Sequence, residues 1–413
     1  MLKKENLISI FVIFSYITLI IGFIASEDLN GGAFGDWGPY TKIIDSFSIN
    51  FLETFLNYHT LGDRHSPITH IFLSLFIKIG FSYDVIRMIN LHLMLLIPFF
   101  IYKCLSIKFD KVDKKYLVLI ATSVFFSTTY RSLSIWPDAR IYGLLFFIIS
   151  LKFFLQFSKF KKINFAYLNI FFLSVSSYFS PNFSLFSIYF FWYYFLEYKY
   201  SLNSLKFILL NTFLSLPAFY YLFILEVNFI FQETTPGSSG TLNLNSSELN
   251  YYNKILIITS IMFFYLIPFI SLKKFADDFS EKYKILLIII PLFFLSVYNF
   301  DYKLMYTGGG IFFLASNYLL SSNYFFYIIC AIAFYYVFYK YFNYNNLFIV
   351  LILILSNIQL TIYHKYYDPL LLLLFLTIFR LDIDKIFFNY KNVIKIYFVN
   401  IIFILSKIVK LII

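Results

Sequence analysis

The sequence predicts an all-α integral membrane protein, and three observations support this fold class. The chain has 413 residues, of which 60% are hydrophobic, 24% aromatic and only 13% charged, whereas a typical soluble domain carries about 25% charged residues. Continuous apolar runs of roughly 17–22 residues recur between polar clusters, as transmembrane helices require. The runs do not alternate between apolar and polar residues, which argues against a transmembrane β-barrel.

The first apolar run, Leu7–Ala25, predicts a retained membrane span, because it is too long for a signal peptide and lacks a small-residue cleavage site. Residues 26–82 are then expected to form a long outer loop with surface helices. Apolar residues at helical spacing over Tyr40–Asn57 predict one amphipathic surface helix. The next stretch, His65–Phe81, is short for a span, whereas Val85–Cys104 is long enough to cross.

Basic residues predict the orientation. The loop after Cys104 reads KFDKVDKK, and the positive-inside rule places it inside if His65–Phe81 is a re-entrant or surface helix. This topology puts about 24 Lys and Arg residues inside and about 9 outside. The other predicted spans are Tyr116–Tyr130, Ile141–Phe157, Ile163–Phe179, Phe183–Leu196, Leu205–Leu225, Ile255–Leu272, Ile285–Tyr298, Tyr324–Tyr341, Leu347–Tyr363 and Pro369–Phe379.

These spans give about twelve crossings, and Val393–Ile413 adds a thirteenth if it crosses. The whole chain, residues 1–413, is expected to be a single multi-pass domain with further outer loops at 226–254 and 299–323. The net charge of +11 follows from the inner loops and does not indicate nucleic acid as a partner. Cys104 and Cys330 lie in apolar segments and are expected to be packing residues.

Ionisable residues gather on the predicted outer side, where chemistry is therefore expected, because such groups near a membrane need water, a partner or a ligand. The inner loops carry plain lysine-rich turns. The outer residues singled out are Asp36, Asp63, Arg64, His65, His70, Asp138, Arg140, His364, Lys365 and Asp368. His59, His65 and His70 are spaced by six and five residues, which fits no single helical face and argues against a metal site.

Four segments, in order, carry a family resemblance: GDWGPYTKIID, DRHSPITHIFLSLFIKIG, DVIRMINLHLMLLIPFFIYKCL and DARIYGLLFFIISLKFFLQF. They resemble the GT-C superfamily of membrane glycosyltransferases, in particular the group of dolichyl-phosphate-mannose-protein mannosyltransferases and aminoarabinose transferases. The likeness covers Met1 to about Phe157, with a weaker echo in YHKYYDPLLLLL at Tyr363–Leu374. It implies a GT-C-like helix bundle.

The resemblance also implies an inverting transfer of a sugar from a polyprenyl phosphate to a hydroxyl acceptor. Asp36 matches the family's catalytic acidic residue and is expected to act as general base, with the nearby glycines forming a tight turn and Pro39 in the first turn of the next helix. The lipid phosphate or donor is expected to meet Arg64, His65, Arg140, Tyr142 and Lys365. Residues expected to support the acceptor are Trp37, Tyr40, Asp63 and Asp138.

Simpler interpretations stand beside these roles. As the alternative interpretation, Asp36 is a turn or cap residue, Asp63 a loop or capping residue and Arg140 an interfacial anchor. The family's acidic pair is reduced here to one Asp followed by Trp37, so we expect no cofactor and no metal site, with a divalent metal as the alternative. The expected location is a bacterial inner membrane with the active site on the periplasmic side.

The expected partners are a polyprenyl-phosphate-linked sugar, the membrane lipid, and a glycan, lipid or protein acceptor. Acceptors of these kinds include a lipid-linked glycan, lipid A and a cell-surface polysaccharide. Two alternative functions are a flippase for a lipid-linked sugar and a polysaccharide polymerase or ligase. The sequence shows neither the paired broken helices of many transporters nor an arginine-rich late loop.

Overall fold

The computed structural model describes residues 4–29, 32–63, 66–224, 250–270, 283–304, 308–357, 361–381, 383 and 387–412. Within these ranges the chain is helical and forms no strand, with one isolated bridge between Gly308 and Ile362. The all-α prediction is therefore confirmed. The chain divides into two compact units, Met1–Gln232 and Glu233–Ile413.

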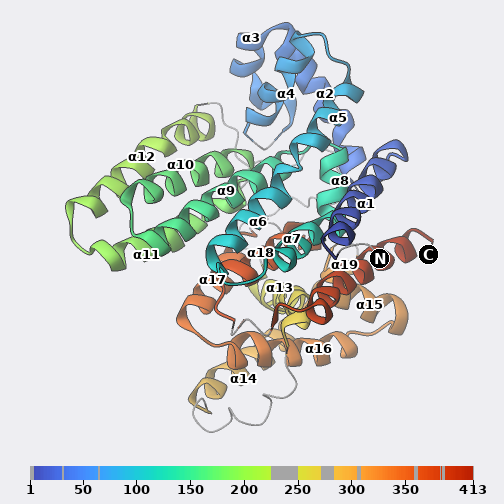
Figure 1. Cartoon of the computed structure of the whole chain (residues 1–413), viewed down its shortest axis with the longest axis vertical. Helices are drawn as coiled ribbons and strands as arrows, with labels where there is room; N and C mark the ends of the chain where they lie inside the picture. Colours follow the sequence, from blue (N-terminus) through green and yellow to red (C-terminus); the bar gives the residue numbers. More distant parts are fainter. Residues whose placement is uncertain are drawn as a thin grey trace. The chain divides into compact units, whose positions relative to one another are not determined.

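The first unit begins with a long helix and a group of short ones (Figure 1). Its elements are α1 (Lys4–Ile24), α2 (Ala33–Ile49), α3 (Phe51–Leu56), the 3₁₀ turn Tyr58–Leu61, α4 (Ile68–Lys78), α5 (Tyr83–Leu93), α6 (Leu96–Lys108), α7 (Lys114–Thr122), the 3₁₀ turn Ser123–Phe126, α8 (Thr128–Ile135), α9 (Ala139–Phe160), α10 (Ile163–Phe179), the 3₁₀ turn Pro181–Phe183, α11 (Phe186–Tyr198) and α12 (Leu202–Phe223).

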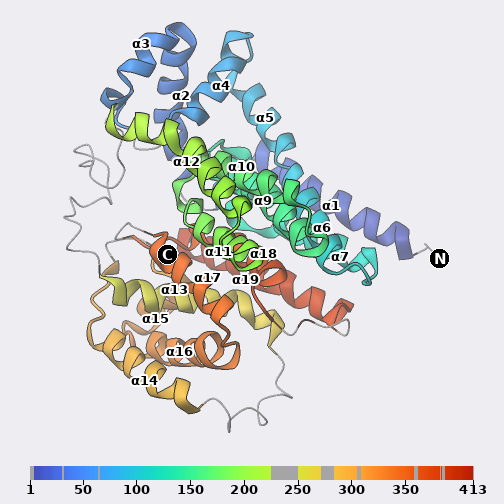
Figure 2. The ribbon, with the colours of Figure 1, turned by 90° about the vertical axis from the view of Figure 1, so that its left-hand side faces the viewer.

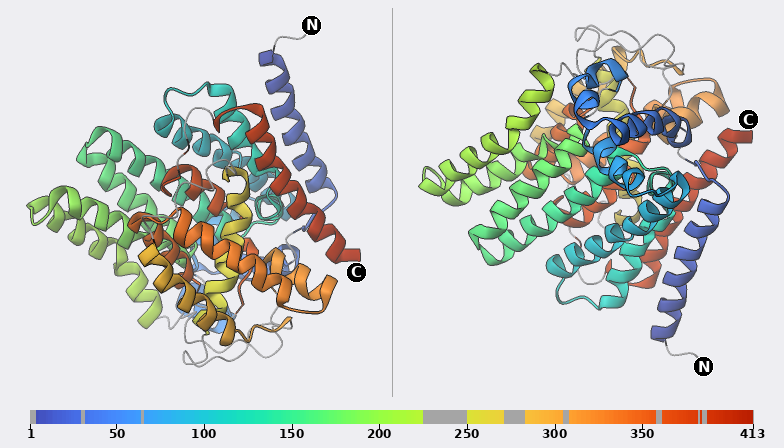
Figure 3. Two further views of the ribbon diagram at one scale, coloured as in Figure 1. Left: turned by 90° about the horizontal axis from the view of Figure 1, so that it is seen from below. Right: turned by 90° about the horizontal axis from the view of Figure 1, so that it is seen from above.

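Two groups of helices organise this unit. The short helices α2, α3 and α4 lie together, with α2 packed on α4, and α9 to α12 lie alongside one another (Figures 1 and 3). Gly143 allows α9 and α10 to approach closely, because an added Cβ would lie 2.6 Å from the Cβ of Ser180. The Ser176 hydroxyl donates to the Gly143 carbonyl at 2.7 Å. The start of α9 is therefore fixed against the end of α10.

Several helices have the length and composition of membrane spans, which supports the prediction of a membrane protein. Four are long and apolar enough to cross, namely Tyr83–Lys108, Ala139–Phe160, Leu202–Phe223 and Tyr251–Phe269, and seven shorter apolar helices accompany them among the described residues. By contrast, α4 has 11 residues and reaches only about 16 Å, about half of a bilayer core. This length suits the predicted surface or re-entrant helix.

The predicted span Tyr116–Tyr130 is not one continuous helix, because the structure divides it into α7, a 3₁₀ turn and α8. Thr122 and Ser123 return their hydroxyls to carbonyls of the preceding turn, Leu119 and Ile120. Ser127 then accepts from the N–H of Tyr130 and starts a new helix. Hydroxyl side chains that bond locally compete with helix continuation in this way. Arg131, which follows this predicted span, lies within α8 and is buried.

The second unit contains α13 (Tyr251–Leu266), the 3₁₀ turn Ile267–Phe269, α14 (Tyr283–Tyr298), α15 (Gly310–Leu320), α16 (Tyr324–Phe334), the π-helical turn Tyr335–Lys340, α17 (Tyr344–Leu355), the 3₁₀ turn His364–Tyr366, α18 (Leu370–Thr377) and α19 (Tyr390–Ile412), as Figure 2 shows. Helix α15 lies within the predicted outer loop 299–323, where no helix was expected. Most of the predicted outer loop 226–254 lies outside the described residues. Cys104 and Cys330 are free and buried, as expected.

Candidate active site

Asp36 lies in a helix rather than in a turn. Helix α2 begins at Ala33 after Gly32, whose φ of 116° is in the left-handed region. The Asp28 carboxylate accepts from the N–H groups of Gly32 (2.9 Å) and Phe34 (3.1 Å), so it caps this helix start. Asp36 is exposed one turn further on.

The predicted geometry around Asp36 therefore needs correction. Gly35 and Gly38 are helical, with open space where a Cβ would stand, and do not form the expected tight turn. Pro39 lies inside α2, beyond its first turn. The surface helix predicted over Tyr40–Asn57 starts earlier, at Ala33, and is divided at Asn50, whose side chain accepts from Glu53 N–H and starts α3. Because these glycines carry no side chains, the helix surface beside Asp36 is open.

Asp63 and His70 form a buried pair, which the sequence did not predict. The Asp63 carboxylate Oδ2 lies 2.5 Å from His70 Nε2, and both residues are buried. The Tyr40 ring packs edge-on against the His70 ring with 4.7 Å between centroids. Asp63 is therefore more than a loop residue, because it ties the turn after α3 to the first helical turn of α4. The spacing of seven residues across a proline turn gave no signal for this pair.

Asp138 and Arg140 start α9. The Asp138 carboxylate accepts from the N–H of Arg140 at 2.7 Å and so caps the helix. Asp138 is buried, whereas Arg140 is half-buried. The guanidinium is carried on the first turn of the helix, where the helix dipole also favours a negative ligand.

Tyr40 links these residues through its electrostatics. Burial raises the pKa of Tyr40 well above its ordinary value, the carboxylates of Asp138, Asp63 and Asp36 raise the pKa further, and the Arg140 guanidinium lowers it. All four charged groups therefore lie close enough to act on the same hydroxyl. The structure brings together five residues that the sequence singled out, from α2, the turn before α4 and the start of α9.

Two further predicted residues pack in the interior. Trp37 is buried, with its ring edge-on to Tyr83 at 5.9 Å. Tyr142 is buried between Phe72 of α4 (5.5 Å) and Phe179 of α10 (5.4 Å). Both side chains support the elements that carry Asp36 and Arg140. Arg64 and His65 lie outside the described residues.

Lys365 belongs to the second unit. It lies in the 3₁₀ turn His364–Tyr366, with its ammonium 5.1 Å from the centroid of the Tyr363 ring. The neighbouring His364 is buried, its Nε2 is 3.1 Å from the Tyr265 hydroxyl and its ring stacks on Phe403 at 3.9 Å. Burial lowers the pKa of His364 well below its ordinary value, so its ring is neutral at physiological pH.

The sequence did not predict a partly buried ion pair between Arg131 of α8 and Glu27, which follows α1. The Arg131 guanidinium donates twice to the Glu27 carboxylate, at 2.6 Å each, and also to Thr18 of α1. Such a bidentate pair fixes direction as well as distance. The Trp136 indole donates to the Glu27 carbonyl at 3.1 Å. Charged residues in such an apolar chain indicate that partners exist, but Glu27 and Arg131 are 104 residues apart in the sequence, so no local pattern pairs them.

Arg87 continues this support. Its guanidinium stacks on the Trp136 ring at 3.6 Å and donates to the Ile135 carbonyl at 3.2 Å. The Trp136 ring also contacts Phe34 of α2, which lies edge-on to it with 4.8 Å between ring centroids. Trp136 therefore joins the start of α2, which carries Asp36, to the segment that leads into Asp138 and Arg140.

Among the residues that the structure describes, no group of three or more His, Cys, Asp or Glu side chains is arranged to hold a metal ion. Comparisons with models of known protein families, with characterised proteins and with solved structures found no match to this chain. The arrangement of the site residues is therefore the basis for inferring a function.

Proposed function

We propose that this protein is a membrane glycosyltransferase that moves a sugar from a polyprenyl phosphate to a hydroxyl acceptor with inversion. The observation that supports it most is the gathering of Asp36, Asp63, Asp138 and Arg140 around Tyr40 from three separate elements. The GT-C-like motif order in the first 157 residues gives these positions their proposed roles.

Exposure separates the roles of the three carboxylates. Asp63 is engaged with His70 and buried, and Asp138 is buried at the cap of α9. Asp36 is exposed beside two glycines that leave open space. Asp36 is therefore the carboxylate that an acceptor hydroxyl can reach, and we assign it as the general base.

The proposed step is a single displacement. The acceptor oxygen attacks the anomeric carbon while its proton passes to Asp36, and the bond from that carbon to the phosphate oxygen breaks. The lipid phosphate leaves with the electron pair, and its growing charge is stabilised by Arg140 at the helix start of α9. Carboxylates nearby also stabilise the positive character of the transition state.

The test is a transfer assay with the purified full chain and labelled polyprenyl-phosphate sugars. Asp36→Asn should lose roughly 10²–10⁴-fold in rate, as expected for loss of a general base. The matched control is Asp110→Asn, an exposed carboxylate in the loop between α6 and α7, which should keep full activity. Wild-type transfer that survives unchanged in Asp36→Asn would overturn the assignment, and movement of sugar lipid across vesicles without transfer would support the flippase instead.

A further inference from the structure

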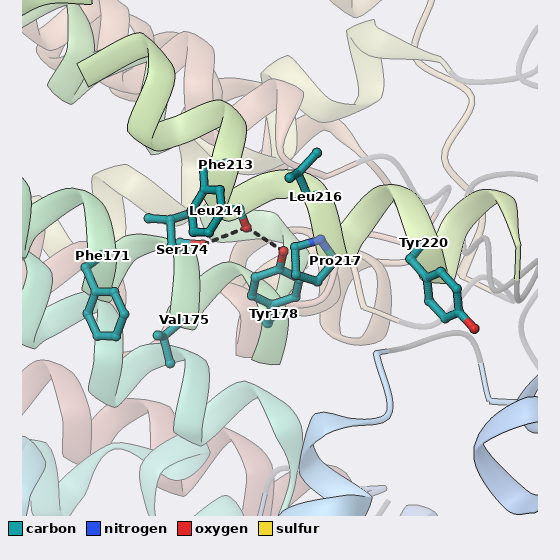
Figure 4. A pocket seen from close by; sticks show the side chains of 9 residues that line it. All are labelled: Phe171, Ser174, Val175, Tyr178, Phe213, Leu214, Leu216, Pro217 and Tyr220. Atoms are coloured by element: carbon teal, nitrogen blue, oxygen red, sulfur yellow. Dashed lines mark hydrogen bonds between the residues drawn. The ribbon is translucent and has the colours of Figure 1, made fainter. Parts of the chain in front are cut away.

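An apolar groove lies between α10 and α12 in the first unit (Figure 4). It has a volume of about 520 Å³ and is lined by four residues of α10 and five of α12, among them Val175, Tyr178, Leu216 and Pro217. Helix α12 is otherwise little buried, since only Ser204 and Phe207 among its residues are buried. The groove therefore lies on a largely exposed apolar helix surface, which is suited to contact with lipid.

The α12 helix is opened at this groove by a side chain of α10. Pro217 has no N–H to give to the preceding turn. The next N–H, that of Ala218, donates to the Tyr178 hydroxyl at 3.2 Å, and this hydroxyl donates to the Leu214 carbonyl at 2.6 Å. Tyr178 thus bridges a helical hydrogen bond of α12. The polar atoms at the floor of the groove satisfy one another, which leaves hydrocarbon surface for an occupant.

One end of the groove adjoins the candidate active site. Tyr220 lines the groove and stacks on Phe55 of α3, with 6.1 Å between ring centroids and an interplanar angle of 7°. The next residue, Tyr221, packs on the cluster that contains the buried Tyr58. The Tyr58 ring lies next to the Asp63–His70 pair, with 6.2 Å between the centroids of the Tyr58 and His70 rings. Burial and the Asp63 carboxylate raise the pKa of the Tyr58 phenol.

An occupant of this groove would have a hydrocarbon chain and a polar end beside the site. Phe171, Leu216 and Tyr220 are exposed, so the groove is open along its side to a chain that enters from the membrane. We infer that the groove binds the isoprenoid chain of the lipid-linked sugar, an inference that rests on the proposed function. The chain would place its phosphate toward Arg140.

The experiment uses the full chain in nanodiscs and a polyprenyl phosphate that carries a photoreactive diazirine in its isoprenoid part. Labelled peptides should map to α10 and α12, and unlabelled polyprenyl phosphate should compete, whereas phosphatidylglycerol should not. Leu216→Trp at the exposed rim should reduce labelling roughly tenfold or more by filling the groove. The control is Leu209→Trp, an equally exposed leucine of α12 outside the groove, which should label as wild type.

Tyr178→Phe provides a second, independent variant, because it removes the bridging hydroxyl without adding bulk. It should also weaken labelling, since Ala218 N–H then returns to Leu214 and the groove narrows. Labelling spread over other helices, equal competition by phosphatidylglycerol, or unchanged labelling in Leu216→Trp would overturn the inference. Specific labelling of a protein that transfers no sugar would support lipid binding in the groove and would refute only the proposed glycosyltransferase activity. Transfer that persists in Leu216→Trp at the wild-type KM would refute only the groove.

Discussion

Three carboxylates and a guanidinium act on the Tyr40 hydroxyl. Its pKa is raised by burial and by these carboxylates, so it stays protonated in the fold and can donate a hydrogen bond to a phosphate or sugar oxygen. Both side chains of the neighbouring Asp63–His70 pair are buried. Removing one partner of such a pair typically costs about 3–5 kcal/mol, so the pair is expected to hold the turn at Asp63 against α4.

The raised pKa of Tyr40 predicts a pH dependence of stability. In the unfolded chain a tyrosine loses its proton near pH 10.0, whereas folded Tyr40 keeps it to higher pH. The unfolded state therefore releases protons first, and the stability present below pH 10.0 is lost as the pH rises toward the folded pKa. The fall in melting temperature between about pH 8 and about pH 11 should be smaller in Tyr40→Phe than in wild type.

The control for this prediction is Tyr200→Phe, because Tyr200 is 97% exposed. Its melting temperature should fall with pH as much as that of wild type. An equal fall of the melting temperature in Tyr40→Phe and wild type would show that Tyr40 titrates as an ordinary tyrosine. The inference that charged groups cluster around it would then be wrong.

At the scale of elements, the site depends on how α1, α2 and α8 are joined. The Glu27–Arg131 pair passes directly over Gly22 of α1, where an added Cβ would lie 2.5 Å from Glu27 Oε2 and 2.9 Å from Arg131 Nη2. Glycine lets the ends of these two side chains lie this close to α1. Gly35 of α2 is the opposite case, because nothing lies within 4 Å of the added Cβ.

These two glycines make a matched prediction. Gly22→Ala should destabilise the protein by about 1–3 kcal/mol, because the added methyl overpacks the ion pair. Gly35→Ala should stabilise α2 by about 0.5–1 kcal/mol, since alanine suits a helix interior better than glycine. Denaturation monitored by thermal shift or by circular dichroism measures both. A neutral Gly22→Ala would mean that the Glu27–Arg131 pair does not lie against α1 in this way.

The elements also show what the sequence could predict. Apolar runs placed most helices, because length and hydropathy depend only on neighbouring residues. The break of the run Tyr116–Tyr130 was missed, since it depends on hydroxyls that bond locally. Asp36, Asp138 and Arg140 were singled out as ionisable residues in an apolar chain, and their role in a site stays a prediction. The pairing of Asp63 with His70, and of Glu27 with Arg131, depends on tertiary contacts that no local pattern encodes.

At the scale of the whole molecule, the proposed chemistry requires α2 to α4 to face outward and the α6–α7 loop to face the cytosol. The basic loop KFDKVDKK supports this orientation. The structure supplies a clean way to measure it, because both native cysteines are buried and free and should not react with a membrane-impermeant maleimide. Single added cysteines at exposed positions then report the side on which each loop lies.

In intact cells, Asn57→Cys next to α3 should react with the impermeant maleimide, because Asn57 is exposed on the surface helices. Lys111→Cys between α6 and α7 is equally exposed and should react only after the membrane is permeabilised. Wild type should stay unlabelled under both conditions. The reverse pattern would place Asp36 in the cytosol, away from an acceptor on the outer face. An outer-face transfer would then be impossible whatever the chemistry of the Asp36 carboxylate, because the base and the acceptor would lie on opposite sides of the bilayer.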